Sequence, residues 1–268
     1  MRILVLLLCL MMLGPAFAAD RPDSACLALA SSRPHLVPAS FGDEIEEDSV
    51  LIRYLDHASF AIVTQDGKIA VTDYTGFIGN PDVVPDIVTM NNAHLTHFTD
   101  NPDPRIPHIL RGWGPVGAAP RIEVDLGSIA VRNVTTDLRG PFGEGARKDG
   151  NSVFLFEAAG LCIVHLSHLH QIPSDEQFGA IGRVDVVMVP VDGAFTMDTK
   201  TMTEVVRRMR ARVVLPMHWF SAEGLAAFVA AMGPGYEVEI STRPDLILSR
   251  KTLPEKPQVI VLNPAYVP

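Results

Sequence analysis

The stretch Asp86 to Phe98, DIVTMNNAHLTHF, is the one around which the rest of the chain is best interpreted. Its apolar run, Ile87 to Met90, is typical of a buried β-strand, and it breaks into a turn that carries His94 and His97. Two imidazoles three residues apart at a strand end can share a metal ion, because neutral imidazole is the commonest protein metal ligand. Two unrelated surface histidines would give the same pattern, so the pair alone does not establish a metal site.

Composition excludes one class of partner. The chain has 268 residues, of which 47% are hydrophobic, which is enough to bury a large α/β core. Its net charge is -9 and its pI is near 5.4, whereas nucleic acid selects basic surfaces. We therefore expect no nucleic-acid partner.

The first eighteen residues have the features of a signal peptide. Arg2 gives a short positive region, Ile3 to Leu13 is an apolar run, and Ala16-Phe17-Ala18 is an A-x-A cleavage site. The apolar run is short for a bilayer span. We expect a periplasmic or secreted protein with no membrane span after cleavage; its oligomeric state is not indicated.

Cysteine usage leaves two alternatives open. Cys9 would leave with the signal peptide, so the mature chain would keep Cys26 and Cys162. An oxidising compartment would allow them to pair, but Cys162 lies in a strand-like run and two cysteines give no framework. A disulfide and a buried free thiol are both compatible with the sequence.

Beyond the signal peptide, the pattern predicts one layered α/β domain. Residues 19–48 are an irregular lead-in with prolines and an acidic cluster, and residues 49–268 form the domain. The stretch Val50 to Val63 alternates in polarity, and Gln65-Asp66-Gly67 predicts a hairpin turn before a strand at Lys68 to Tyr74. The irregular segment 99–120 follows the His pair, so we expect it to line a pocket.

The second half alternates between strands and helices. The continuous apolar run Val184 to Val191 predicts a strand buried on both faces. Asp198 is a helix N-cap, and apolar residues then recur at helical spacing up to Met209. Further strands are predicted at 122–124, 128–134, 152–157, 161–166, 213–215, 237–240 and 259–262, and a second helix at 225–232.

Histidines follow three of these predicted strands. Besides His94 and His97, the cluster HLSHLH carries His165, His168 and His170, and His218 ends the strand that begins at Val213. Loops at strand ends are where α/β folds assemble sites. A metal site for Zn, Cu, Fe or Ni would explain the pattern, and a set of unrelated loop histidines is the alternative.

A succession of blocks, YLDHASFAI, KIAVTDY, PDIVTMNNAHLTHFTD, DGNSVFLFEAAGLCIVHLSHLH, VDVVMVPVDGAFTMD and ARVVLPMHW, resembles the metallo-β-lactamase superfamily. Within it, the nearer resemblance is to the branch of ascorbate-6-phosphate lactonase and related Zn-dependent hydrolases. The resemblance runs from about Val50 to Trp219. It implies an αββα sandwich with an HxHxDH motif, two metals, and hydrolysis of esters, lactones, amides or phosphodiesters through a bridging hydroxide.

The chain departs from that motif at several ligand positions. Asn92 stands at the first histidine and Thr96 at the aspartate, while His94 and His97 are kept. A further family histidine falls on Thr136, ahead of Asp137. The bridging aspartate falls on His168, and the closing histidine is retained as His218.

These departures predict at most one metal ion, because one family site keeps only His94 and an imidazole nitrogen does not bridge two metals as a carboxylate does. The expected ligands are His97, His168 and His218, with His94 as a possible fourth; zinc is the first candidate and no organic cofactor is implied. By the same resemblance His57 lies near the pocket and could orient a ligand; a buried strand-end histidine is the alternative. We place His165 in the pocket with Asn92, Thr96, Thr136 and Asp137.

Two functions remain open. The first is an exported metal-dependent hydrolase of a small-molecule lactone, ester or phosphoester. The second is a non-hydrolytic member of the same fold that binds a metal or ligand, because the two motif carboxylates are missing. The basic residues Arg105, Arg111, Arg139, Arg147 and Lys148 lie in the predicted pocket loops, where they would suit an anionic substrate.

Overall fold

The computed structural model describes Ser24, Cys26 and residues 45–94, 96–115, 118–139 and 146–266. The expected signal peptide and most of the lead-in lie outside these residues. None of the described helices is long and apolar enough to cross a membrane.

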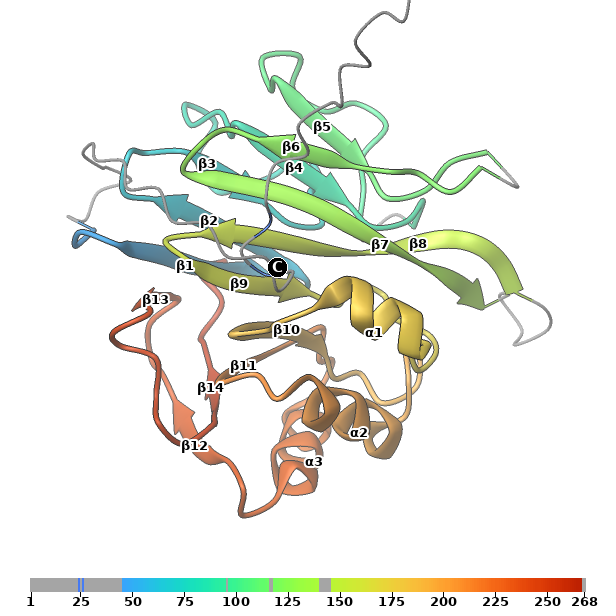
Figure 1. The fold of residues 1–268 in the computed structure, drawn as a ribbon, viewed down its shortest axis with the longest axis vertical. Helices are drawn as coiled ribbons and strands as arrows, with labels where there is room; N and C mark the ends of the chain where they lie inside the picture. Colours follow the sequence, from blue (N-terminus) through green and yellow to red (C-terminus); the bar gives the residue numbers. More distant parts are fainter. Residues whose placement is uncertain are drawn as a thin grey trace, which may run out of the picture.

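Two mixed β-sheets pack face to face (Figure 1). The six-stranded sheet has the order β13-β1-β2-β3-β4-β5. Its strands are β1 (Ser49–Asp56), β2 (Ser59–Thr64), β3 (Ile69–Val71), β4 (Ile87–Met90), β5 (His108–Arg111) and β13 (Asp245–Ser249).

The eight-stranded sheet has the order β12-β14-β11-β10-β9-β8-β7-β6. Its strands are β6 (Glu123–Asp125), β7 (Ile129–Arg139), β8 (Ala146–Ala158), β9 (Leu161–His165), β10 (Val186–Pro190), β11 (Val213–Met217), β12 (Glu237–Ile240) and β14 (Gln258–Val261). The neighbours β9, β10 and β11 run parallel, so their carboxyl ends meet at one edge.

The main core lies between the sheets. Alternate residues of each strand point to the same face, so Ile52, Phe60, Phe154 and Phe156 are all fully buried in one cluster. This burial is the main source of the sandwich's stability and fixes the relative position of the two sheets.

Three helices cover the outer face of the eight-stranded sheet (Figure 1): α1 (Asp175–Ile181), α2 (Thr199–Met209) and α3 (Ala222–Met232). The helix predicted from Asp198 is confirmed as α2, whose N-cap is Asp198 and whose buried face includes Met202 and Val206. The helix predicted at 225–232 is confirmed as part of α3.

Loops, rather than helices, cover the outer face of the six-stranded sheet in the part of the chain that the structure describes. Tyr74, Val84, Ile106 and Trp113 pack there against the strands. The metallo-β-lactamase fold is confirmed, but the helical layer expected on this side of the αββα sandwich is replaced. Pro81, Pro85, Pro102, Pro104 and Pro107 interrupt the covering segment, and proline cannot continue an α-helix because it lacks an N–H.

Three other local expectations need correction. The stretch Val50 to Val63 is two antiparallel strands, β1 and β2, because the chain turns at His57. The segment 99–120 includes the strand β5, which extends the sheet next to β4. Helix α1 was not expected from the sequence; its capping box joins Ser174 and Gln177.

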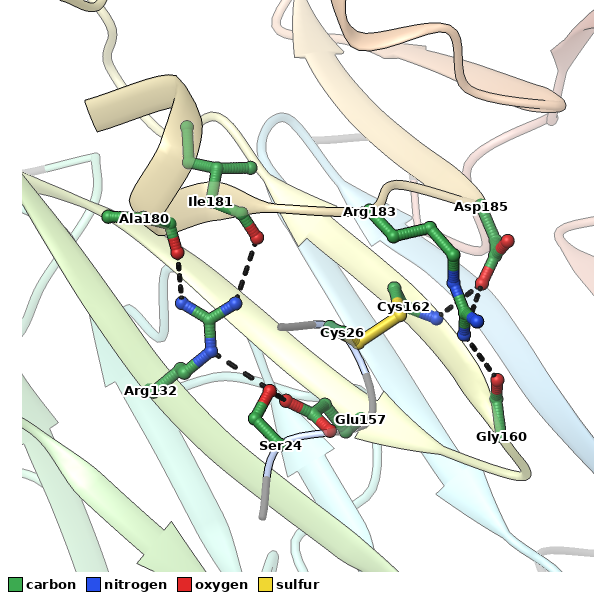
Figure 2. The surroundings of a disulfide bond; sticks show 10 residues. All are labelled: Ser24, Cys26, Arg132, Glu157, Gly160, Cys162, Ala180, Ile181, Arg183 and Asp185. Carbon is green, nitrogen blue, oxygen red and sulfur yellow. Dashed lines mark hydrogen bonds and ion pairs between the residues drawn. A yellow bond between two sulfur atoms is a disulfide. The ribbon is translucent and has the colours of Figure 1, made fainter. Parts of the chain in front are cut away.

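Cys26 and Cys162 form a disulfide, which settles the alternative left open by the sequence (Figure 2). The bond fastens part of the lead-in to β9. Beside it, Cys26 accepts a hydrogen bond from the Arg183 backbone N–H, and Ser24 Oγ donates to Glu157. The lead-in is therefore attached to the eight-stranded sheet at this point.

Candidate metal centre

The site lies where several strands end. Asp73 follows β3, His97 follows β4, His168 follows β9 and His218 follows β11. Asp73, His218 and also His57, in the β1–β2 turn, have positive φ angles of 44°, 58° and 40°. A left-handed backbone is uncommon for residues other than glycine, although aspartate and histidine adopt it more often than most, so contacts with the surrounding structure help to hold these residues in place.

His97 is the fully buried centre of the group. Its Nδ1 lies 2.7 Å from Asp73 Oδ2, and the same oxygen accepts a hydrogen bond of 2.7 Å from Asn91 Nδ2. Burial raises the pKa of Asp73 to about 7, against the effect of the nearby His165 and His218. A cation at Nε2 would hold the proton on Nδ1 and keep the carboxylate charged.

His218, like His97, has a carboxylate beside its Nδ1. Its Nδ1 lies 3.0 Å from Asp192 Oδ2, in the loop that follows β10. Burial opposes ionisation of Asp192, but hydrogen bonds from His218, from the Thr196 backbone and hydroxyl, and from the Ala194 backbone hold its pKa well below the usual range. The Asp192 carboxylate therefore lies against His218 Nδ1, while His218 Nε2 faces His97.

Ring nitrogens of His97, His168 and His218 lie close to one another. His218 Nε2 lies 3.2 Å from His97 Nε2, and His168 Nδ1 lies 2.9 Å from the same atom. Two nitrogens bound to one tetrahedral zinc ion at about 2.0–2.1 Å would lie roughly 3.3–3.4 Å apart. The spacing of these nitrogens, with a carboxylate beside the Nδ1 atoms of His97 and His218, is that of a donor set that fits a divalent metal.

Burial keeps these imidazoles neutral. Burial and the neighbouring His218 hold the pKa of His97 well below its ordinary value. Burial, with His97 as the next cause, lowers the pKa of His168 to about 2. A metal ligand must be deprotonated, so both side chains are ready to bind at neutral pH.

His57 belongs to the same cluster. One ring nitrogen from each of His57, His97 and His218 lies within 4.8 Å of the other two. The His57 ring is 4.1 Å from that of His218, its Nε2 is buried without a hydrogen-bond partner among the described residues, and its carbonyl accepts the His218 N–H. His57 is therefore placed as a further ligand or as a support for His218.

His94 and His165 lie differently from their neighbours. His94 is exposed; its ring is 5.6 Å from the rings of both His97 and His168, and its Nδ1 is 3.1 Å from Thr96 Oγ1. His165 is fully buried between the sheets, where its Nε2 donates to the Ala58 carbonyl at 2.8 Å. His94 thus lies at the entrance of the site, and the hydrogen bond of His165 is to the core backbone rather than to the site.

Comparison with known proteins gives a direct match. Residues 51–218, more than half of the chain, match the family described as the beta-lactamase superfamily domain. The chain belongs to the metallo-β-lactamase superfamily. This finding does not show the lactonase branch.

The curated relatives of this superfamily member are archaeal. The chain is 27% identical over 187 residues to a UPF0173 metal-dependent hydrolase of Methanospirillum hungatei, covering 63% of this chain and 82% of the relative. It is 23% identical over 250 residues to one of Thermococcus onnurineus, covering 81% and 98%.

Solved structures agree with the fold. A Thermotoga maritima protein classed as a Zn-dependent hydrolase of the superfamily aligns with a TM-score of 0.57 and 25% identity, over 80% of this chain and 98% of that one. CmlA, a diiron β-hydroxylase of Streptomyces venezuelae, aligns with a TM-score of 0.51 and 13% identity, over 77% and 55%. The second likeness concerns the fold alone.

The positions at which this chain departs from the superfamily motif, and their neighbour Asp137, are either buried or hydrogen-bonded to other residues. Asn92 is buried, and neither polar atom of its side chain has a partner among the described residues. Thr136 accepts from Asn151 Nδ2 at 2.7 Å, and Asp137 accepts from the Asp149 N–H. Thr96 is exposed beside His94.

Asp192 is a candidate site residue that the sequence analysis missed. It lies in the quoted block VDVVMVPVDGAFTMD, directly after a strand predicted to be buried, which is the signal that was available. Asp73 is likewise absent from the sequence-based set of site residues, and the structure shows that it contacts His97 and Asn91.

Proposed function

We propose that this protein is an exported metal-dependent hydrolase with one divalent ion, zinc being the first candidate, on His97, His168 and His218. The observation that carries the proposal is the 3.2 Å approach of the His97 and His218 Nε2 atoms, each imidazole being held through Nδ1 by a buried carboxylate. His57 is better placed than the exposed His94 as a further ligand.

Each residue has a defined part in this proposal. Asp73 and Asp192 orient the imidazoles and hold their protons on Nδ1, while burial of the cluster keeps competing protons and water away. A bound divalent ion would supply Lewis acidity and lower the pKa of water, and neutral ligands leave its charge unneutralised. His94, at the entrance, faces the position from which a substrate would approach.

The substrate would be a lactone, an ester or a phosphoester. The names of the archaeal relatives support a metal-dependent hydrolase. The resemblance of the sequence blocks to the ascorbate-6-phosphate lactonase branch supports lactones. The Cys26–Cys162 disulfide supports export, because disulfides persist in oxidising compartments.

Metal analysis of the purified mature protein tests the site. We expect one equivalent of tightly bound metal, and loss of binding in His97→Ala and His218→Ala. His108→Ala, in strand β5, is the matched control and should bind as the wild type does. Two equivalents would contradict the mononuclear site. His168→Asp should allow a second ion to bind, because a carboxylate bridges two metals.

Hydrolysis is tested on the metal-loaded protein with a γ-lactone, a 4-nitrophenyl ester and a 4-nitrophenyl phosphodiester. We expect turnover of at least one of them that a chelator abolishes and metal restores. A protein that binds metal but turns over none of these substrates would favour the second function, a non-hydrolytic metal-binding member. The presence of Thr96 and His168 at two carboxylate positions of the superfamily motif is the observation in its favour.

A further inference from the structure

Two exposed phenylalanines stand beside the metal centre. The side chains of Phe195 and Phe220 are 64% and 63% exposed, although large apolar side chains are usually buried. Their rings meet edge to face at 5.5 Å, and the Phe220 ring lies 5.2 Å from that of His218 and 5.7 Å from that of His57. We call this pair the aromatic rim.

The rim is tied to the residues of the site. Phe220 comes two residues after His218, at the end of β11. Phe195 comes three residues after Asp192, which accepts hydrogen bonds of 2.9 Å from the backbone N–H groups of Ala194 and Thr196 on either side of it. The same contacts that position His218 therefore also hold Phe195 in place.

Three of the basic side chains expected to meet an anionic substrate contact other groups of the protein. Arg139 donates to the Ala194 and Phe195 carbonyls at 3.0 Å, so its guanidinium supports the rim. Arg147 donates to the Gly114 carbonyl, and Arg105 pairs with Asp103. Three of the five basic residues expected to meet an anionic substrate are thus committed to other groups.

We propose that Phe195 and Phe220 bind the apolar acyl portion of an uncharged ester or lactone, and so set the substrate class of this site. The inference rests on the proposed function. An acyl chain covering the two rings would remove apolar surface from water next to the site. The loop that carries Phe195 is held by the backbone hydrogen bonds to Asp192 before any ligand arrives, which lowers the entropy cost of binding.

The test compares chain lengths in binding and in turnover. Acetohydroxamate and octanohydroxamate, which bind metal without being hydrolysed, are titrated into the zinc-loaded protein by calorimetry. In parallel, kcat/KM is measured for 4-nitrophenyl acetate and 4-nitrophenyl octanoate. We expect the wild type to prefer the octanoyl member by about tenfold or more, and Phe195→Ala and Phe220→Ala each to reduce that preference by about fivefold.

Phe77→Ala is the matched control. Phe77 is 54% exposed, and its ring packs on that of Tyr266; among the described ring pairs it does not contact a site histidine. It should leave the preference unchanged. Unfolding midpoints of all three variants should match that of the wild type, because the substituted side chains are exposed.

The outcomes separate this inference from the proposed function. If neither ester is hydrolysed, the proposed hydrolase activity is contradicted. A preference for octanohydroxamate over acetohydroxamate that Phe195→Ala and Phe220→Ala reduce would still support the aromatic rim. Equal or absent binding of the two hydroxamates, or a preference that the rim variants leave intact, overturns the inference. Tighter binding of inorganic phosphate than of octanohydroxamate overturns it as well.

Discussion

At the scale of single residues, the site depends on carboxylates that would not themselves touch the metal. Asp192 contacts His218 Nδ1, and Asp73 contacts His97 Nδ1. Each carboxylate selects the tautomer that presents Nε2 to the centre. The carboxylate beside each of these histidines is therefore part of what prepares it to bind a metal.

Asp192→Asn tests this dependence. Asparagine can still accept from the Ala194 and Thr196 N–H groups, so the loop should keep its conformation, but the negative charge behind His218 is lost. We expect zinc affinity to fall about 10–100-fold, measured by competition with a chromogenic chelator. Asp137→Asn is the control, because that carboxylate accepts from the Asp149 N–H in the β7–β8 hairpin. Equal affinities for the two variants would contradict the role of Asp192.

At the scale of elements, three parallel strands carry the site to one edge and three helices support them from behind. Helix α3 is the least amphipathic of the long helices, and its buried residues are Phe228 and Met232. Phe228 is fully buried against the eight-stranded sheet. The position of α3, which follows the rim residue Phe220, thus depends on two side chains.

Phe228→Ala should destabilise the protein by about 3–5 kcal/mol, because it removes a fully buried ring and leaves a cavity. The measurement is urea unfolding of the metal-free protein. The exposed neighbour Ala227, changed to serine, should alter stability by no more than about 0.5 kcal/mol. A loss below about 1 kcal/mol in Phe228→Ala would show that α3 is anchored elsewhere.

At the scale of the whole molecule, the disulfide joins positions 136 residues apart. Such a link removes conformational freedom from the unfolded chain, and the effect grows with loop length. It also attaches the lead-in to the β9 strand, which continues into His168. The stability of this chain should therefore depend on whether its compartment keeps the Cys26–Cys162 disulfide oxidised.

Reduction with dithiothreitol should lower the free energy of unfolding by about 2–5 kcal/mol. Cys26→Ser should show the same loss without reductant. The double variant Cys26→Ser/Cys162→Ser is the control: its free energy of unfolding should be the same with and without dithiothreitol. Unchanged stability of the wild type on complete reduction, verified by thiol titration, would show that the bond adds nothing to the fold.

Acid should also destabilise the metal-free protein. Burial lowers the pKa of His57, His97, His165, His168 and His170. Below the ordinary histidine pKa of about 6.5, the unfolded chain binds protons that the folded chain excludes, so the free energy of unfolding falls as pH drops.

Two groups act in the opposite direction: burial raises the pKa of Asp73 to about 7 and raises the pKa of Asp56 above its usual value, which favours the folded state at low pH. Five histidines against two acids give a net loss. We expect the urea midpoint, measured with a chelator present, to decrease from pH 7.5 to pH 5. A midpoint that stays constant or rises over this range would contradict the buried, neutral state of the cluster.

Much of the architecture could be predicted from local patterns. The α2 helix followed from a cap and helical spacing, and most strands followed from apolar runs, because these signals need no distant contact. The β1–β2 turn at His57 was missed, since His57 adopts a left-handed conformation that tertiary contacts impose. Among the described residues, loops stand where the resemblance implied an outer helical layer on one side, and the prolines of that segment were visible in the sequence.

The sequence by itself determined the superfamily, the strand ends that carry histidine, and the absence of the motif carboxylates at Thr96 and His168. Only the tertiary structure decided which side chains meet. It brought His97 and His218 together across 121 residues, placed Asp192 behind His218, directed His165 to the core backbone and left His94 exposed. The physical reason is that strand periodicity sets where a strand ends, whereas packing between the two sheets sets the direction of each side chain beyond that end.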